Sequence, residues 1–294
     1  MTHWRAILLA FVFAMATAAQ SLQDSIASRV RGFPGTVSLY AKNLDSGAAV
    51  GLAESSPVRT ASTIKLPIML AVFDAVARGQ MKWSDPITLT HSEKVSGSGI
   101  LGSEISDGVQ LPLRDVLNLM IVLSDNTATN LVLDRITADA VNAYLDKLGL
   151  KTTRSLRKIL GAAELKPSAA GRLAENEKYG LGVSTPRDMV AILEKLERGE
   201  IVNPEASREM IAILKRCRDD SGIRRRFAGT PVANKTGSLD ALRSDVGMVY
   251  SPGARVAMAI TVEGIPKVDY TPDNPGCLLI ADLAKMLVEG LAKR

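Results

Sequence analysis

The residues with the clearest chemical potential are Ser62 and Lys65, which form the pattern Ser-x-x-Lys. They stand at the start of an apolar run, 64–76, whose spacing suits a largely buried helix. Residues three apart share a helix face, so the Lys65 amine can stand beside the Ser62 hydroxyl and accept its proton. A helix N-terminus at Ser62 also favours negative charge that develops there. The spacing therefore predicts a serine nucleophile with a lysine base.

One such pattern is weak evidence, because a second Ser-x-x-Lys occurs at Ser155 to Lys158 in a basic stretch without helical spacing. Two further tripeptides separate the candidates. Ser124-Asp125-Asn126 lies where one apolar helical segment gives way to another, and Lys235-Thr236-Gly237 lies on a predicted strand. The ordered set S-x-x-K, S-D-N and K-T-G is typical of class A β-lactamases and penicillin-binding proteins. The chain resembles this serine hydrolase family over essentially its whole mature length.

The chemistry of amide acylation agrees with the resemblance around Ser62. Lys65 must be neutral part of the time to act as a base, and both burial and a second cation at Lys235 lower the pKa of an amine. The resemblance implies that the backbone N–H groups of Ser62 and Ser238 bind the oxyanion, and one such donor contributes about 3 to 4 kcal/mol. Gly237 would let the strand approach the substrate closely.

The resemblance also implies roles for the other polar residues. Ser124 would pass a proton to the leaving nitrogen, and Asn126 would bind the acylamide of the substrate. Lys235 and Thr236 would bind a substrate carboxylate, with Arg243 as a second cation, although the spacing before Arg243 departs from the commonest one in the family. Each residue also has a structural alternative, such as a helix cap for Ser124 or a surface charge for Lys235.

The glutamate that hydrolyses the acyl-enzyme in class A β-lactamases, in the pattern E-x-x-L-N, is missing from 151–184. Glu175 and Glu164 are the nearest candidates for this deacylation base, and neither stands at the expected offset; we favour Glu175. Without a base at this step, hydrolysis slows by about 10² to 10⁴ while acylation continues. For Asp125 we predict a structural role.

Strand patterns at both ends of the chain enclose a helical middle. They occupy 36–43, 48–53, 232–236, 246–250 and 255–262, and the helical segments include 21–32, 113–123, 127–136, 137–148 and 277–291. Thr185-Pro186 and Asn203-Pro204 are helix starts. We predict an α+β fold in which an antiparallel sheet from both termini is flanked by helices and carries an inserted all-α subdomain. The sheet subdomain would comprise 20–60 and 205–294, and the helical subdomain 61–204, with a long loop at 151–184.

Residues 1–19 have the features of a signal peptide, namely Arg5, an apolar stretch and small residues before the predicted cleavage. The alternative is a buried N-terminal helix. The apolar stretch is shorter than the roughly 20 residues of a membrane span, and no later segment approaches that length. We expect a mature chain that works in the periplasm or as a secreted protein.

Composition narrows the remaining possibilities. Hydrophobic content of 46% and charged content of 23% are ordinary for a globular protein. The net charge of +5 is scattered, and aromatic content of 4% is low for a nucleic-acid binder, so we expect no such partner. Two histidines cannot build a multi-histidine zinc site, and His91 stands in a polar segment, so we expect no metal, no cofactor and no Ser-His-Asp triad. Cys217 and Cys277 form one disulfide or none.

Three functional hypotheses follow. The first is a β-lactamase that hydrolyses the β-lactam amide through an acyl-Ser62 intermediate. The second is a carboxypeptidase or transpeptidase acting on peptidoglycan stem peptides. The third is a non-catalytic β-lactam-binding or sensor module. The absence of the deacylation glutamate suggests this hypothesis. For each of them we expect a monomer that binds a small molecule or a peptide.

Overall fold

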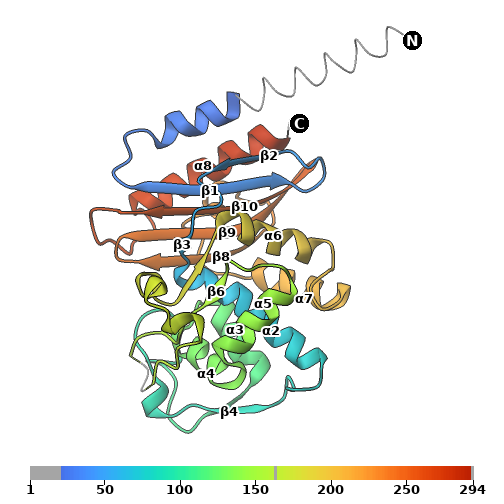
Figure 1. The fold of residues 1–294 in the computed structure, drawn as a ribbon, viewed down its shortest axis with the longest axis vertical. Helices are drawn as coiled ribbons and strands as arrows, with labels where there is room; N and C mark the ends of the chain where they lie inside the picture. Colours follow the sequence, from blue (N-terminus) through green and yellow to red (C-terminus); the bar gives the residue numbers. More distant parts are fainter. Residues whose placement is uncertain (1–20, 162–163, 293–294) are drawn as a thin grey trace.

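The computed structural model describes residues 21–161 and 164–292, so the predicted signal peptide at 1–19 lies outside the described residues. In the described part, a sheet with helices on both faces lies above a helical region (Figure 1). No helix of this part is long and apolar enough to cross a membrane.

The sheet has five antiparallel strands in the order β2-β1-β10-β9-β8, so its members come from both ends of the chain. The bounds are Thr36–Asn43 for β1, Ala49–Leu52 for β2, Val232–Leu239 for β8, Leu242–Ser251 for β9 and Ala254–Glu263 for β10. All five strand patterns in the sequence are therefore strands of one sheet. The predicted α+β fold class is confirmed.

The two faces of the sheet are covered by different helices. Alternate strand residues point to opposite faces, so Val256 and Met258 of β10 pack with α8 (Pro275–Ala292) and a helix at 21–30. Ala257 and Ala259 belong instead to the core of the helical region. The alternation buries both faces of β10 and joins the sheet to the helices that carry the site.

The helical region begins with a short 3-10 helix, η1 (Ala61–Ile64), which continues into α2 (Lys65–Ala77). The helices α3, α4 and α5 span Leu113–Val122, Asn126–Ile136 and Ala138–Lys147, and α6 and α7 span Pro186–Glu197 and Pro204–Lys215. Thr185 and Asn203 cap α6 and α7 by accepting hydrogen bonds from Asp188 N and Ala206 N. Both predicted helix starts are correct because a polar N-cap precedes proline at the first position.

The segment 151–184 contains only short elements, as its lack of periodicity predicts. They are β6 (Arg154–Ser155), η3 (Ala170–Arg172), η4 (Ala174–Tyr179) and β7 (Gly182–Ser184). β7 pairs with β6 and with β3 (Val58–Arg59), which fixes both ends of the loop near η1. The remaining short elements are β4 (Pro86–Thr88), η2 (His91–Glu93), β5 (Gln110–Pro112) and η5 (Ile223–Arg226).

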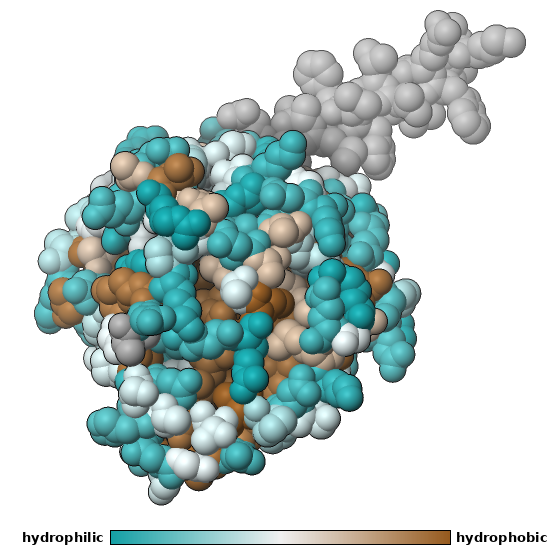
Figure 2. Space-filling view, turned by 60° about the horizontal axis from the view of Figure 1, so that its bottom comes forward, coloured by the Kyte–Doolittle hydropathy of each residue, from teal (hydrophilic) through white to brown (hydrophobic). Residues whose placement is uncertain are grey.

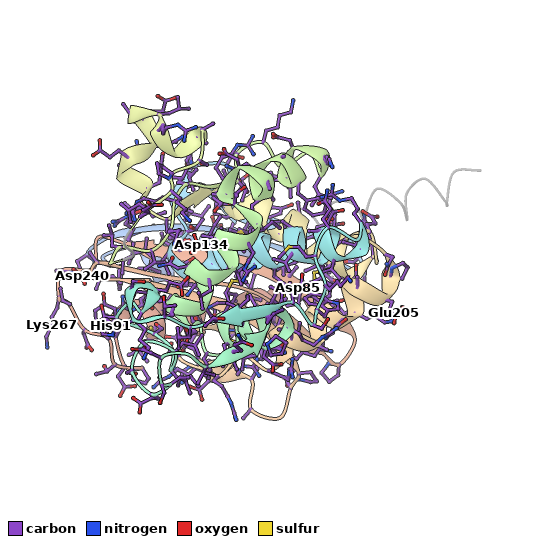
Figure 3. The ribbon with its side chains drawn as sticks, turned by 90° about the horizontal axis from the view of Figure 1, so that it is seen from below. Asp85, His91, Asp134, Glu205, Asp240 and Lys267 are labelled. Atoms are coloured by element: carbon purple, nitrogen blue, oxygen red, sulfur yellow. The ribbon has the colours of Figure 1, made fainter. Side chains whose placement is uncertain are left out.

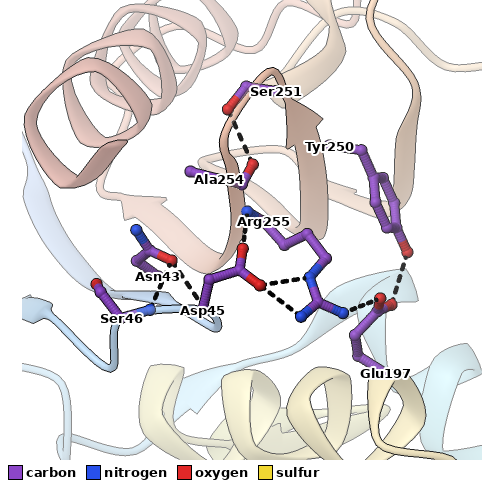
Figure 4. A network of polar contacts seen from close by, with 8 residues as sticks. All are labelled: Asn43, Asp45, Ser46, Glu197, Tyr250, Ser251, Ala254 and Arg255. Atoms are coloured by element: carbon purple, nitrogen blue, oxygen red, sulfur yellow. Dashed lines mark hydrogen bonds and ion pairs between the residues drawn. The ribbon is translucent and has the colours of Figure 1, made fainter. Parts of the chain in front are cut away.

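A polar network ties the sheet to α6 (Figure 4). Arg255 of β10 donates to Asp45 in the β1–β2 turn and to Glu197 at the end of α6. Glu197 also accepts a hydrogen bond from the Tyr250 hydroxyl. One arginine thus links a hairpin turn and a helix end that are far apart in the sequence.

Candidate active site

Ser62 lies in the 3-10 turn η1, and Lys65 is the first residue of α2. The α-helix therefore starts at Lys65, three residues after the predicted start at Ser62. Residues three apart nearly eclipse each other in a 3-10 turn, so Ser62 and Lys65 still share a face. Ala61 has a φ of +47°, which is rare outside glycine, and such strain often marks functional turns. The turn leaves Ser62 partly exposed while Lys65 is fully buried.

The Lys65 amine is held by the segment between α3 and α4. Its Nζ donates to the Ser124 carbonyl at 2.7 Å and to Asn126 Oδ1 at 3.0 Å, and it lies 3.2 Å from Ser124 Oγ. Among the described residues, Ser62 Oγ is not a hydrogen-bond partner of this amine. The first two motifs therefore meet in space, with the amine bonded to the second of them.

Burial lowers the pKa of Lys65 well below its usual value, and the nearby Lys235 cation lowers it further. The Asp125 carboxylate acts in the opposite direction and is outweighed. A lowered pKa makes the neutral amine, the only form that can accept a proton, accessible at lower pH than for an exposed lysine. The role of Lys65 as a general base stays a prediction that this environment suits.

Ser124 lies between the two amines. Lys235 Nζ donates to Ser124 Oγ at 2.9 Å and to the Thr236 carbonyl at 2.9 Å. The Lys235 side chain is fully buried, and this burial lowers its pKa despite the nearby Asp219 and Asp245 carboxylates. A hydroxyl in contact with two amines can accept a proton from one and donate its own to another group. The predicted role of Ser124 as a proton relay is compatible with these contacts and stays a prediction.

The conformation of Ser124 depends on Asp125 and on glycines that the sequence reasoning did not single out. Ser124 has a φ of +54°, and the next residue, Asp125, accepts from Ala128 N, Ile100 N and Leu101 N at 2.7 to 2.9 Å. A Cβ at Gly99 would stand 2.2 Å from the Asp125 carboxyl group, so only glycine fits there. Asp125 is a buried cap and tether, which matches its predicted structural role.

Asn126 is fixed from both ends of its amide. Its Oδ1 accepts from Lys65, and its Nδ2 donates to the Ser96 carbonyl at 3.1 Å. A Cβ at Gly97 would come within 2.6 Å of that Nδ2. The glycine-rich segment 96–101 therefore forms a wall beside Asn126, and its signal in the sequence was the pair of closely spaced glycines.

Gly237 brings the edge strand β8 against the nucleophile turn. A Cβ at this position would stand 2.7 Å from the Thr60 carbonyl oxygen and 3.1 Å from the Ser62 nitrogen. Ser238 follows directly and is exposed. The segments that carry the two predicted oxyanion donors are thus in contact, and the pairing of Ser62 and Ser238 stays a prediction. The close approach that glycine permits here is to the nucleophile turn itself.

Arg243 is buried on β9, opposite Ser238 in the strand register. Its guanidinium donates to the carbonyl oxygens of Leu239, Leu242 and Asp269 and lies over the Tyr270 ring. These contacts fasten the β8–β9 turn to the segment before α8. Its predicted role as a second cation for substrate was not tested by these contacts and stays a prediction.

The role of Glu164 or Glu175 as the deacylation base stays a prediction. Both are exposed, and within the described residues neither bonds to Ser62 or Lys65. The loop is fastened here by Asn130, whose Oδ1 accepts from Ile159 N at 2.8 Å and whose Nδ2 donates to Ile159 O at 3.3 Å. Asn130 stands one turn after Asn126 on α4, so this clamp places a partly buried isoleucine on the side of α4 that carries Asn126.

The remaining sequence candidates lie outside the site. Ser155 of the second Ser-x-x-Lys is buried on β6, and its Lys158 bonds to Asp134 at 2.6 Å. His91 is exposed and faces Asp107, and it lies toward the edge of the molecule in Figure 3. Cys217 and Cys277 are buried and carry free thiols. Across the described ranges, acidic, histidine and cysteine side chains form no group of three or more that could hold a metal.

One face of the molecule combines apolar and hydrophilic side chains. Seen from the helical end, apolar residues gather in the middle of the face and hydrophilic residues border them (Figure 2). The buried amines of Lys65 and Lys235, which share the Ser124 hydroxyl, are the central feature of the candidate site.

A protein-family model, the β-lactamase enzyme family, matches residues 19–291, and the chain belongs to this family. Among curated proteins, it is 25% identical to the β-lactamase regulatory protein BlaB of Streptomyces cacaoi, with 87% of this chain and 93% of BlaB covered. It is 26% identical to a β-lactamase of Streptomyces albus G, with 86% and 79% covered.

Solved structures agree in fold. A β-lactamase from Sphaerobacter thermophilus is 28% identical, with a TM-score of 0.77 and 95% and 97% of the two chains covered. PBP-A is 29% identical, with a TM-score of 0.77 and 93% and 97% covered. The relatives thus include β-lactamases, a regulatory protein and a protein named PBP-A.

Proposed function

We propose that this chain is an exported serine hydrolase that opens the β-lactam ring through an acyl-Ser62 intermediate. The observation that carries the proposal is the position of Ser124 Oγ, 3.2 Å from Lys65 Nζ and 2.9 Å from Lys235 Nζ. Two buried amines that share one hydroxyl have little use in stabilising a fold, because burial of charge costs free energy. They suit a site that must move protons.

In the proposed reaction, neutral Lys65 accepts the Ser62 proton as Ser62 Oγ attacks the lactam carbonyl. The backbone N–H groups of Ser62 and Ser238 bind the oxyanion. Ser124 then donates its proton to the ring nitrogen as the C–N bond breaks and recovers one from Lys65. The products of this half-reaction are an ester on Ser62 and a secondary amine within the ring-opened substrate, so protons and bonds balance.

A specific observation favours slow release of the acyl group. Asn130 clamps the backbone of Ile159, an aliphatic residue, beside α4, while Glu164 and Glu175 are exposed. The similar PBP-A has a solved acyl-enzyme complex with penicillin G in a leucine-to-glutamate variant. The second candidate function is therefore a carboxypeptidase or transpeptidase acting on peptidoglycan, for which a long-lived penicillin adduct is expected.

The similarity to the regulatory protein BlaB is the observation that favours the sensor hypothesis. A non-catalytic sensor that binds β-lactams reversibly would keep the pocket but form no covalent bond at Ser62. The two buried amines at one hydroxyl argue against this, because burial of charge costs free energy that reversible binding does not require.

The deciding experiment mixes the mature protein with penicillin G and follows intact mass over time. A covalent adduct that is absent in Ser62→Ala supports the proposal, and Ser155→Ala is the control because it alters the other Ser-x-x-Lys pattern. Rapid loss of the adduct with ring-opened product indicates a β-lactamase, and a persistent adduct indicates the peptidase alternative. No adduct in the wild type, or one that survives in Ser62→Ala, rejects acylation at Ser62.

A further inference from the structure

A cavity of about 550 Å³ lies beside the segment that leads from α7 through η5 to β8. Its charged lining residues are Asp220 and the consecutive arginines 224–226. Three arginines against one aspartate leave an excess of two positive charges in the lining. Ser62, Lys65, Ser124 and Lys235 are not among the described residues that line it, so this cavity is separate from the candidate active site.

Arg224 carries a charge in this cavity that no carboxylate balances. Its Nη2 donates to the carbonyl oxygens of Lys215 at 3.2 Å and Val232 at 2.7 Å, and to Asn234 Oδ1 at 3.0 Å. All of these acceptors are uncharged. Within the described ranges Arg224 forms no ion pair, and its Nε is buried without a partner. Because a half-buried cation without a counter-ion is costly, a bound anion would stabilise this arrangement.

The two neighbouring arginines differ from Arg224 in this respect. Arg225 Nη2 lies 2.5 Å from a carboxylate oxygen of Asp273, and Arg226 Nη2 lies 2.8 Å from one of Asp282. These ion pairs connect η5 to the start of α8 and to the segment before it. The pairs therefore hold the arginine run in place, while the charge that remains unbalanced is that of Arg224.

We propose that this cavity is a binding site for a phosphate-type oxyanion, which Arg224 holds, and that it is distinct from the hydrolase site. A guanidinium group presents several donors in one plane and matches the oxygens of a phosphate group. A phosphate group carries a charge of about −1.5 to −2, which balances the excess in the lining. The Thr230 hydroxyl lines the same cavity and is a further donor.

The first test locates the anion. Amide spectra of the ¹⁵N-labelled mature protein are recorded by NMR at low salt during a titration with inorganic phosphate. The amides of 228–230 should shift progressively, with a dissociation constant of about 1 mM from two charge-assisted hydrogen bonds. Shifts confined to the surroundings of Ser62 and Lys235 would overturn the proposal, and so would the absence of any shift.

Two substitutions at Ala228 test the charge of the cavity without touching the bonds of Arg224. Ala228 is exposed and lines the cavity, so its replacement should leave the fold intact. Ala228→Asp adds a negative charge and should weaken phosphate binding by about tenfold, whereas the matched Ala228→Asn should keep the wild-type affinity to within about twofold. Equal affinities in the two variants would overturn the proposal.

Two further substitutions change the native charges in opposite directions. Arg224→Gln should weaken binding by about tenfold or more, because the charge-assisted bonds are lost. Arg208→Gln is its control, since Arg208 is exposed on α7 outside the cavity. Asp220→Asn removes the carboxylate in the lining and should strengthen binding by about two- to fivefold. Equal losses in Arg224→Gln and Arg208→Gln, or unchanged binding in Asp220→Asn, would place the anion elsewhere and overturn the proposal.

The cavity has room for the group that carries the phosphate, so a soluble phosphate ester and a lipid headgroup share the chemistry of this site. Glycerol phosphate is titrated in the NMR experiment, and cosedimentation is measured with phosphatidylcholine vesicles with and without phosphatidylglycerol. Cosedimentation that requires phosphatidylglycerol and is lost in Ala228→Asp assigns the site to a lipid headgroup. Binding of glycerol phosphate without cosedimentation assigns it to a soluble ester. Binding of neither the phosphates nor the vesicles at 228–230 overturns the proposal, whatever the outcome of acylation at Ser62.

Discussion

The segments that carry the three motifs and the loop at 151–184 meet the same site in different ways. The motif segments present amines, hydroxyls and backbone donors, with Lys65, Lys235 and Asp125 fully buried. The loop is also fastened firmly, since Asn130 clamps Ile159 and Asp134 binds two loop lysines. The loop is anchored, yet it presents no carboxylate to Ser62 among its described residues. A segment of this protein can therefore be firmly anchored without carrying groups that could take part in catalysis.

This difference matters because acylation and hydrolysis need different groups. Acylation needs a base for the serine proton, a relay to the leaving nitrogen and donors for the oxyanion. Hydrolysis of the ester also needs a base that activates water. In the proposed reaction the motif segments supply the first set, and the aliphatic side chain of Ile159 has no group that could serve as the second.

The largest effect is expected from a substitution in the segments that carry the three motifs. In Lys65→Met, the acylation rate should fall by about 10² to 10⁴ because the base is lost. In the wild type, the rate should rise with pH and level off well below the usual amine pKa, since burial and Lys235 lower the pKa of Lys65 and only the neutral amine is active. The measurement is the acylation rate from pH 5 to 10. Lys158→Met, in the other Ser-x-x-Lys, should keep the wild-type profile, and an unchanged rate in Lys65→Met would exclude Lys65 as the base.

A somewhat smaller effect is expected from placing a carboxylate on the loop at 151–184. Ile159→Glu places a carboxylate where Asn130 holds the backbone beside α4, and hydrolysis of the acyl-enzyme should accelerate by about 10²-fold. Decay of the penicillin adduct by intact mass measures this rate. Glu175→Gln is the contrast, because Glu175 is exposed and its loss should leave the decay unchanged. If the adduct of Ile159→Glu does not decay faster, a missing carboxylate at this position is not what limits hydrolysis. A large slowing of the decay in Glu175→Gln would assign deacylation to Glu175.

The smallest effect is expected from loosening the loop. Asp134 accepts from Lys158 and Lys166, each at 2.6 Å, and Lys158 is nearly buried. Asp134→Asn should lower the free energy of unfolding by about 1 to 3 kcal/mol, between the values for exposed and buried ion pairs. Urea unfolding measures the change, and acylation by penicillin should persist. Loss of acylation with an intact fold would show that the two regions are coupled.

The ion pairs of Asp134 with Lys158 and Lys166 also predict how this stabilisation depends on pH. Burial opposes ionisation of Asp134, but its two lysine partners prevail and lower its pKa. The folded state therefore binds fewer protons than the unfolded state in this range. The contribution is present above the unfolded pKa of about 3.9 and disappears as the pH falls through the lowered folded value. Asp134→Asn should remove this part of the acid sensitivity.

Much of the fold was predictable because its signals are local. The strand patterns at 36–43 and 255–262 alternate or cluster apolar residues, and the caps Thr185 and Asn203 define helix starts by their own chemistry. The start of α2 was less predictable, since a 3-10 turn and an α-helix share the same apolar spacing over one turn. Its position follows from the contact of Gly237 with the Thr60 to Ser62 backbone, which joins residues far apart in sequence.

The sequence by itself determined which residues can do chemistry: the order of three motifs names Ser62, Lys65, Ser124 and Lys235, and the loop lacks the family's glutamate pattern. Only the tertiary structure decided that Lys65 bonds to Ser124 and Asn126, and that Asn130 clamps the backbone of Ile159. The reason is physical. Residue types and local spacing fix what a side chain can donate or accept, whereas the partner it meets depends on how distant segments pack.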